Sequence, residues 1–144
     1  MVRDLLRKDL AGLAALYEFF WDERSDIKKM NDMFTKLDAD PAYIHLCYVG
    51  ENGKIAGAVM GVVCCELYGD CRPFMVLENM IVSPNLRKNG IGQALYIELE
   101  KRAVLAGCRQ IILVTEKERK DACGFYESLG FAKQSTGYKK KLDA

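Results

Sequence analysis

The sequence predicts an α/β (α+β) fold in which about four helices flank a twisted, mixed sheet of six to seven strands. Two amphipathic segments open the chain, and an Asn-Gly pair at Asn52 and Gly53 then separates two β-rich runs. That pair predicts an antiparallel hairpin. A strand, a helix and a strand follow between residues 74 and 115, an order that predicts a right-handed crossover with parallel pairing. A sheet that contains both kinds of pairing is mixed.

The N-terminal part is expected to hold one strand and two helices. Residues 1–6 predict a short strand, and apolar residues at helical spacing predict helices over 10–21 and 27–37. The second helix must end before Pro41, because proline restricts the residue before it to extended geometry. Strands over 43–49 and 55–67 then flank the Asn-Gly turn.

The C-terminal half is expected to alternate strands and helices. The strand over 74–82 lies at the centre of the sheet and leads into a helix over 90–106, after which Gly107 suits a left-handed C-cap. Residues 110–115 predict a buried strand. Asp121 can cap a short last helix that Gly130 ends, and the alternating tail over 131–142 predicts a closing hairpin.

Composition limits the classes of function. A chain of 144 residues that is 50% apolar can bury the core of one domain spanning residues 1–144. The net charge of +1, from 21 basic and 20 acidic residues, predicts no nucleic-acid partner. A signal peptide and a membrane-spanning run are both lacking, which predicts a cytoplasmic protein without a membrane partner. Six cysteines without a Cys-x-x-Cys pair, and a single histidine, predict reduced thiols and no metal site.

A glycine-bearing turn follows the apolar run at 80–82 and carries the clearest chemical signal. Gly90 and Gly92 let the backbone approach a ligand closely, and the unpaired amides of the following helix start favour phosphate. The turn does not end in Gly-Lys-Ser/Thr, as a Walker loop does, and it lacks the third glycine of a dinucleotide-binding fingerprint. Both common nucleotide-binding interpretations are therefore disfavoured.

Two motifs about 30 residues apart resemble the GNAT family of acetyl-CoA-dependent N-acetyltransferases, and the similarity extends over nearly the whole chain. The family's pyrophosphate loop is matched by Arg87-x-x-Gly90-x-Gly92. Its second signature is matched by Ala122-x-x-Phe125-Tyr126-x-x-x-Gly130-Phe131. The resemblance implies a sheet splayed between its fourth and fifth strands, with acetyl-CoA bound in the cleft.

The resemblance also implies which residues bind acetyl-CoA. The backbone of residues 80–82 would hydrogen-bond the pantetheine arm, and the amides of residues 88–92 would hold the pyrophosphate, with Arg87 adding a positive charge. These backbone positions are Met80, Ile81, Val82, Lys88, Asn89, Gly90, Ile91 and Gly92. Two positions depart from the family pattern. Arg119 stands where the family often has Asn, so a cofactor contact is either lost or replaced by a guanidinium that meets a CoA phosphate. Cys123 stands where relatives often carry His, and core packing is its preferred interpretation.

Two residues are candidates for the chemical step. A substrate ammonium has a pKa of about 10 and must lose a proton before it attacks a thioester. Glu78 lies on the strand that leads to the loop and matches a family carboxylate that acts directly or through water. Its alternative role is an exposed or salt-bridged strand carboxylate. Tyr126 matches the motif position that can protonate the departing thiolate and contact the cofactor, and its alternative role is a core aromatic residue.

The resemblance predicts transfer of acetyl from acetyl-CoA to an amine by direct attack in a ternary complex. A small primary amine is favoured over a protein N-terminus or lysine, and Trp21, Asp22 and Glu23 occupy the region that borders the acceptor cleft in this family. They equally suit a solvated helix end. The alternative function is a non-catalytic acyl-CoA-binding sensor or partner-binding module. Sheets of this family often pair through C-terminal strands, so the resemblance favours a homodimer.

Overall fold

The computed structural model describes residues 1–143, which divide into two compact units. The first unit, Met1–Ile112, contains β1 (Val2–Asp4), α1 (Leu10–Trp21), α2 (Ile27–Asp38), β2 (Tyr43–Val49), β3 (Ile55–Cys64), β4 (Phe74–Val82), α3 (Ile91–Leu105) and β5 (Ile111–Ile112). It also holds two short 3-10 turns, η1 (Arg7–Asp9) and η2 (Pro84–Leu86). The second unit begins at Leu113 and contains α4 (Lys120–Ser128). The assignment of both units to one domain stays a prediction.

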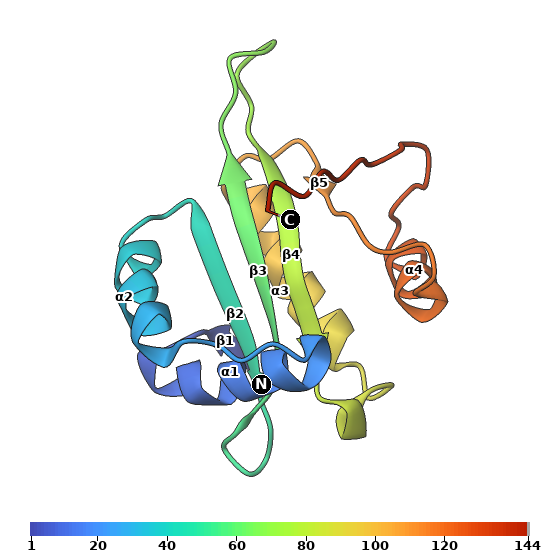
Figure 1. Ribbon diagram of the computed structural model, residues 1–144. Coiled ribbons are helices and arrows are strands. Elements are labelled where there is room, and N and C mark those ends of the chain that lie inside the picture. Colours follow the sequence, from blue (N-terminus) through green and yellow to red (C-terminus); the bar gives the residue numbers. More distant parts are fainter. Residues whose placement is uncertain (144) are drawn as a thin grey trace. The chain divides into compact units, whose positions relative to one another are not determined.

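The sheet of the first unit has the strand order β1-β2-β3-β4-β5 (Figure 1). The first four strands pair antiparallel, and β5 pairs parallel with β4. The predicted mixed α/β fold is therefore confirmed, and the described residues contain four helices. In the part of the chain that the structure describes, the sheet has five strands and not six to seven.

Two strand predictions in the C-terminal part are wrong. The tail over 131–142 forms no closing hairpin, since residues 132–143 are exposed and its basic run has no apolar face to bury. The strand predicted over 110–115 is limited to Ile111 and Ile112. It is not buried either, because Ile112 is 44% exposed.

The predicted turns agree with the structure more closely. The β2–β3 hairpin turns at Gly53, whose φ of 75° is the left-handed conformation expected there, and the Gly50 N–H donates to the Lys54 carbonyl at 2.9 Å. Gly107 and Gly130 follow α3 and α4 with φ of 78° and 94°. The predicted Asp121 cap is wrong, because α4 begins at Lys120 and Arg119 occupies the N-cap position.

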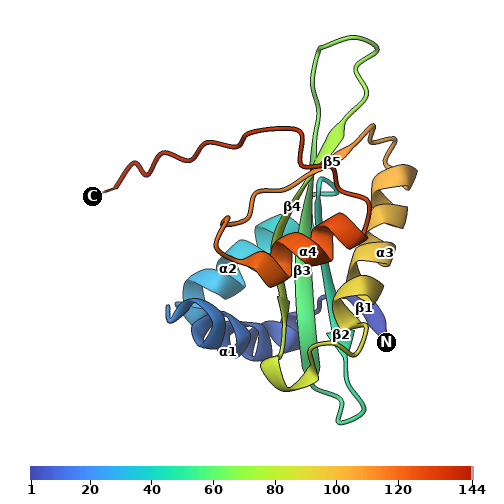
Figure 2. The ribbon, with the colours of Figure 1, turned by 90° about the vertical axis from the view of Figure 1, so that its right-hand side faces the viewer.

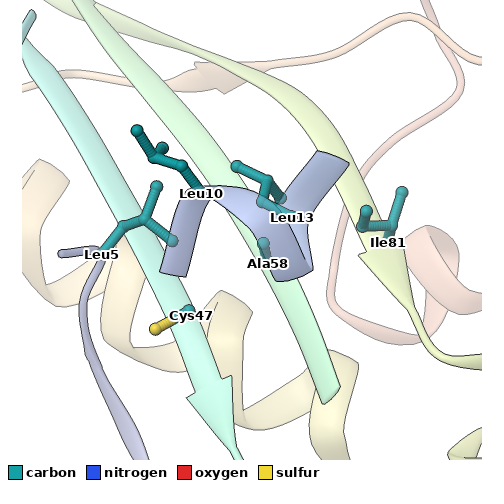
Figure 3. Close-up of a cluster of buried hydrophobic side chains, with 6 residues drawn as sticks. All are labelled: Leu5, Leu10, Leu13, Cys47, Ala58 and Ile81. Carbon is teal, nitrogen blue, oxygen red and sulfur yellow. The ribbon is translucent and has the colours of Figure 1, made fainter. Parts of the chain in front are cut away.

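Helices cover both faces of the sheet in the first unit. Figure 2 shows α1 and α2 on one face and α3 on the other. On the first face, Leu10 and Leu13 of α1 pack against Ala58 and Ile81 (Figure 3). On the second face, a Cβ added at Gly61 would lie 2.7 Å from a methyl carbon of Leu99, so only glycine allows α3 to approach β3 this closely. No helix within residues 1–143 is both long and apolar enough to cross a membrane.

A buried carboxylate anchors the N-terminal strand to η1. The Asp9 side chain is 7% exposed and accepts hydrogen bonds from both terminal nitrogens of Arg3, at 2.7 and 3.0 Å. It also accepts one from the Leu6 N–H at 2.8 Å. The hydrogen bonds from Arg3 are the main reason that the pKa of Asp9 lies below its ordinary value. Burial opposes this shift without reversing it.

Asp9→Asn is expected to lower the free energy of unfolding at pH 7 by about 1–3 kcal/mol, because it leaves a buried guanidinium contact incompletely paired. The pKa of Asp9 is lower in the folded than in the unfolded chain, so its stabilisation is present above pH of about 4 and is lost as the pH falls through the folded value. The variant should therefore lose less stability than the native protein below pH of about 4. Urea unfolding across this range measures both effects, with the exposed Asp70→Asn as control. Equal acid sensitivity of Asp9→Asn and native protein would contradict the prediction.

Candidate functional site

The edge of β4 that faces β5 is only partly paired. The two strands pair at Met75 with Ile111 and at Val76 with Ile112, and β4 continues to Val82 beyond the end of β5. Within the described residues, β4 from residue 77 onward therefore has no β5 partner. Backbone groups on such an edge can pair with an extended, peptide-like ligand. The backbone positions predicted to bind pantetheine, residues 80–82, lie on this part of the strand.

A β-bulge interrupts β4 immediately before those positions. Glu78 pairs with Met60 and Ile81 with Ala58, so two residues of β4, Asn79 and Met80, lie opposite a single residue of β3. Asn79 has a φ of 53°, in the left-handed region. Sequence reasoning missed this bulge, although asparagine is one of the residues that tolerate such a φ best.

The bulge decides which face of the sheet Glu78 occupies. Residues 58 and 60 of β3 are two apart and share a face, so their partners Ile81 and Glu78 also share one. Ile81 packs against α1, and Glu78 therefore lies on the α1 face with an exposed side chain. In a regular strand, residues 78 and 81 would lie on opposite faces.

The segment between β4 and α3 has the geometry of an anion-binding turn. Residues 84–90 are exposed, and Lys88 and Gly90 have φ of 64° and 76°. Gly90 is the N-cap of α3, and no side chain caps this helix start. The first N–H groups of a helix have no partner within it, and they carry the positive end of the helix dipole. A Cβ added at Gly90 would have no heavy atom within 4 Å, so there is room beside the turn for a ligand.

Arg87 lies at the start of this turn and contacts the protein on both sides. Its Nε donates to the Val82 carbonyl at 3.4 Å, and its guanidinium carbon lies 5.4 Å from the centre of the Phe20 ring. The carbonyl contact is long, so the ring contact is the better-formed of the two. The Asn89 side chain donates to the Leu86 carbonyl at 3.2 Å and closes the turn.

An aromatic cluster at the end of α1 borders the bulge and the turn. The Tyr17 and Trp21 rings lie 5.2 Å apart, as do those of Phe20 and Trp21. Burial raises the pKa of Tyr17, and the Asn79 side chain opposes this shift. The contact of Phe20 with Arg87 depends on tertiary packing and could not be read from the sequence.

The second unit contains the other predicted residues. Tyr126 is half-buried in α4, with ring centres 5.3 Å from Phe125 and 5.8 Å from Phe131. Arg119 is exposed at the start of α4, and Cys123 is half-buried, with its thiol 3.8 Å from the Glu116 carbonyl oxygen. The second motif thus forms a local aromatic cluster around the tyrosine.

A cavity of about 250 Å³ lies elsewhere in the first unit, bordered by residues of β1, α2, β2 and α3. None of the residues predicted from the sequence lines it. His45, which does, has a pKa lowered by burial, with Asp38 opposing the shift. Among residues 1–143, no group of three or more His, Cys, Asp or Glu side chains could hold a metal ion.

Comparison with known proteins agrees with this geometry. The family model described as Acetyltransferase (GNAT) family matches residues 13–131, which is well over half of the chain. The chain belongs to the GNAT acetyltransferase family. An acetyltransferase of Pectobacterium atrosepticum is 33% identical over 100 residues, which are 69% of this chain and 64% of that relative. This GNAT chain therefore spans slightly less than two thirds of the length of that relative.

Solved structures share the fold over the full chain. Glucosamine-6-phosphate N-acetyltransferase from Arabidopsis thaliana has a TM-score of 0.89 at 21% identity, over 99% of this chain and 98% of that one. AAC(6')-Iy, in complex with the bisubstrate analogue CoA-S-monomethyl-acetylneamine, has a TM-score of 0.82 at 19% identity, over 100% and 98% of the two chains. At these identities the likeness concerns the GNAT fold alone.

Gly90→Ala is expected to lower the free energy of unfolding by about 1 kcal/mol, because an L side chain is strained at a φ of 76° even where there is room for it. Gly124→Ala is the matched control. Its added Cβ would also have no heavy atom within 4 Å, but Gly124 lies inside α4 without a positive φ. The control should therefore be neutral or stabilising. Urea unfolding of both variants measures the difference, and equal stability of the two would contradict the prediction.

Proposed function

We propose that this GNAT-family protein transfers the acetyl group of acetyl-CoA to an amine by direct attack in a ternary complex. The observation that carries the proposal is the continuity of two backbone features. Within the described residues, the part of β4 without a β5 partner is followed by the turn before α3, whose first residues have no side-chain cap. The first suits an amide-bearing pantetheine arm, and the second suits a pyrophosphate.

The turn before α3 suits the pyrophosphate of CoA. It is exposed, it has left-handed φ at Lys88 and Gly90, and alternation of left-handed with ordinary backbone is the conformation in which N–H groups form anion-binding concavities. Arg87 and Lys88 add two cationic side chains. We assign the pyrophosphate to the amides of residues 88–92 and the pantetheine to the backbone of residues 80–82. Arg119 is proposed to meet a phosphate of the same molecule.

The proposed reaction forms one bond and breaks one. The amine nitrogen attacks the thioester carbonyl carbon, the new C–N bond forms, and the C–S bond breaks as CoA leaves. The ammonium proton passes to Glu78, directly or through a water molecule, before or during attack. Tyr126 donates its phenolic proton to the departing thiolate. Glu78 then releases its proton to solvent, and Tyr126 takes up a proton from solvent.

A small primary amine is the proposed acceptor. The end of α1 presents Trp21, which is 44% exposed, followed by Asp22 and Glu23. An aromatic face and carboxylates at the C-terminal end of a helix favour a cation. Two fold neighbours are consistent with a small-molecule acceptor, since one is named a glucosamine-6-phosphate N-acetyltransferase and the other was solved with an acetylneamine-containing analogue.

Glu78→Gln is expected to lower amine-dependent thiol release from acetyl-CoA by about a hundredfold near pH 7, because the amide keeps the shape but accepts no proton. The loss should shrink as the pH approaches about 10, where the amine is neutral without a base. Thiol release from acetyl-CoA, measured with a panel of small amines and basic peptides, tests the reaction and identifies the acceptor class. The exposed Glu51→Gln in the β2–β3 turn is the control. Full activity of Glu78→Gln at pH 7 would show that Glu78 is not the base of the reaction.

Tyr126→Phe is expected to lower kcat by about tenfold or more, because the thiolate leaves without a proton donor. The Phe ring keeps the contacts with Phe125 and Phe131, so the aromatic cluster of the second motif should stay intact. Tyr138→Phe, at a side chain 91% exposed, is the control. An unchanged kcat would leave Tyr126 with a packing role only.

Tight acetyl-CoA binding by the native protein, without turnover on any amine, would instead favour a cofactor sensor.

A further inference from the structure

We propose that Phe20 is a positioning residue that holds the guanidinium of Arg87 at the start of the turn before α3, in place to meet the pyrophosphate of acetyl-CoA. The proposal rests on the proposed function, in which this turn binds the pyrophosphate. The contact that carries it joins two residues of the first unit. The guanidinium carbon of Arg87 lies over the Phe20 ring, 5.4 Å from its centre. In this role Phe20 acts through Arg87.

The contact suits a cation that must stay available to a ligand. An aromatic ring attracts a guanidinium through its negative face and leaves the positive charge in place. A carboxylate partner would neutralise that charge and would compete with phosphate for the same N–H groups. Among residues 1–143, Arg87 pairs with no carboxylate, and its two terminal nitrogens have no hydrogen-bond partner. Its Nε makes the long contact of 3.4 Å with the Val82 carbonyl oxygen.

Two other arginines in the described part of the chain also lie over rings, but their N–H groups are occupied. The guanidinium carbon of Arg109 lies 5.5 Å from the centre of the Tyr68 ring, and its Nη2 donates to the Glu66 carboxylate at 2.9 Å. Arg7 lies 5.2 Å from another ring, and its terminal nitrogens donate to side-chain oxygens of α2 at 3.2 and 2.7 Å. Arg87 therefore differs from both, because its ring contact leaves the terminal N–H groups for a ligand.

The ring that holds Arg87 is itself fixed. Phe20 is half-buried and packs against the core cluster that includes Leu13 and Ile81. The Trp21 ring meets the Phe20 ring edge-on, with centres 5.2 Å apart. The Arg87 side chain is exposed, and an exposed arginine loses rotamer freedom when it binds a phosphate. Contact with a fixed ring restricts those rotamers before the ligand arrives, so less freedom is lost on binding.

The test measures the dissociation constant of acetyl-CoA by calorimetry for Phe20→Leu, Arg87→Met and their double variant. Phe20→Leu keeps an apolar side chain but removes the ring, and it should weaken binding by about three- to fivefold. Arg87→Met removes the charge and should weaken binding by about tenfold. Because Phe20 acts through Arg87, the double variant should also lose about tenfold, and not the product of the two losses. The control is Phe19→Leu, the same substitution at the preceding residue of α1, which is 69% exposed.

A truncated ligand separates positioning from packing. S-acetyl-pantetheine has the thioester and the amide-bearing arm of acetyl-CoA but no pyrophosphate. Its dissociation constant, measured by NMR titration, should be the same for Phe20→Leu and for the native protein, because it has no phosphate for Arg87 to meet. A general loss of structure would weaken the binding of both ligands.

A measurement on the native protein tests the contact itself. With no ligand bound, the ring current of Phe20 should shift the Nε–H proton resonance of Arg87 upfield from the position of an unstructured arginine. The shift should disappear in Phe20→Leu and persist in Phe20→Tyr, which keeps the ring. This measurement does not depend on the folding of Phe20→Leu.

Several results would overturn the proposal. Native affinity of Phe20→Leu for acetyl-CoA, or losses that multiply in the double variant, would show that Phe20 does not act through Arg87. Equal weakening of both ligands would assign Phe20 to packing. An unshifted Arg87 resonance in the native protein would show that the ring does not hold the guanidinium.

Failure of the proposed function has a different signature. The native protein would then bind acetyl-CoA without amine-dependent turnover, while Phe20→Leu would still weaken that binding. That result overturns the transferase and supports the role of Phe20. Normal turnover by the native protein, together with native acetyl-CoA affinity in Phe20→Leu, overturns the role of Phe20 alone.

Discussion

The candidate site in the first unit depends on the way β4 changes partners along its length. Its first residues lie between β3 and a parallel β5, and from residue 77 onward β3 is its only strand partner within residues 1–143. A strand in the middle of a sheet has both edges satisfied, and an unpaired edge is normally covered or shortened. Here the stretch without a β5 partner is followed by a turn and then by a helix start that lacks a side-chain cap, so residues 77–92 offer two kinds of backbone binding group.

Backbone conformation, more than side-chain chemistry, builds this site. Three residues from β4 to the start of α3 have positive φ, namely Asn79, Lys88 and Gly90. The first belongs to the bulge that decides the face of Glu78, and the other two lie in the turn before α3. Strained conformations persist only where the surrounding structure supports them. The aromatic cluster at the end of α1 contacts this turn, since Phe20 lies under Arg87.

The rest of the first unit provides a rigid frame for this segment. Leu46, Met75, Leu95 and Leu99 are fully buried between the sheet and its helices, and a glycine lets α3 approach β3. The interior tolerates little change in volume, so the register of β3 against β4 is held firmly. The ion pair of Arg3 with the buried Asp9 fixes the start of the chain beside α1. The helix that carries the aromatic cluster is therefore anchored at its own N-terminal end.

The sequence by itself determined the features that arise from local chemistry. The Asn-Gly hairpin, the glycine after α3, the helix end before Pro41 and the glycine-bearing turn all follow from the conformations that these residues allow. The order of strands and helices was predictable for the same reason, and the two short motifs identified the family. Local signals failed where pairing partners decide the outcome. The tail forms no strand within the described residues, β5 is only two residues long, and Arg119 rather than Asp121 occupies the N-cap position of α4.

Only the tertiary structure decided how the candidate residues of the first unit relate to one another. The bulge arises because β4 has one more residue than β3 between the same two paired positions. The sequence of a single strand does not show that difference. The contact of Phe20 with Arg87 joins positions more than 60 residues apart. In the sequence this ring has the same spacing as any core-facing side chain of a helix. An apolar residue of a helix can pack in the core or contact a functional site. The tertiary structure decides between these roles, because it determines which residues lie opposite the helix.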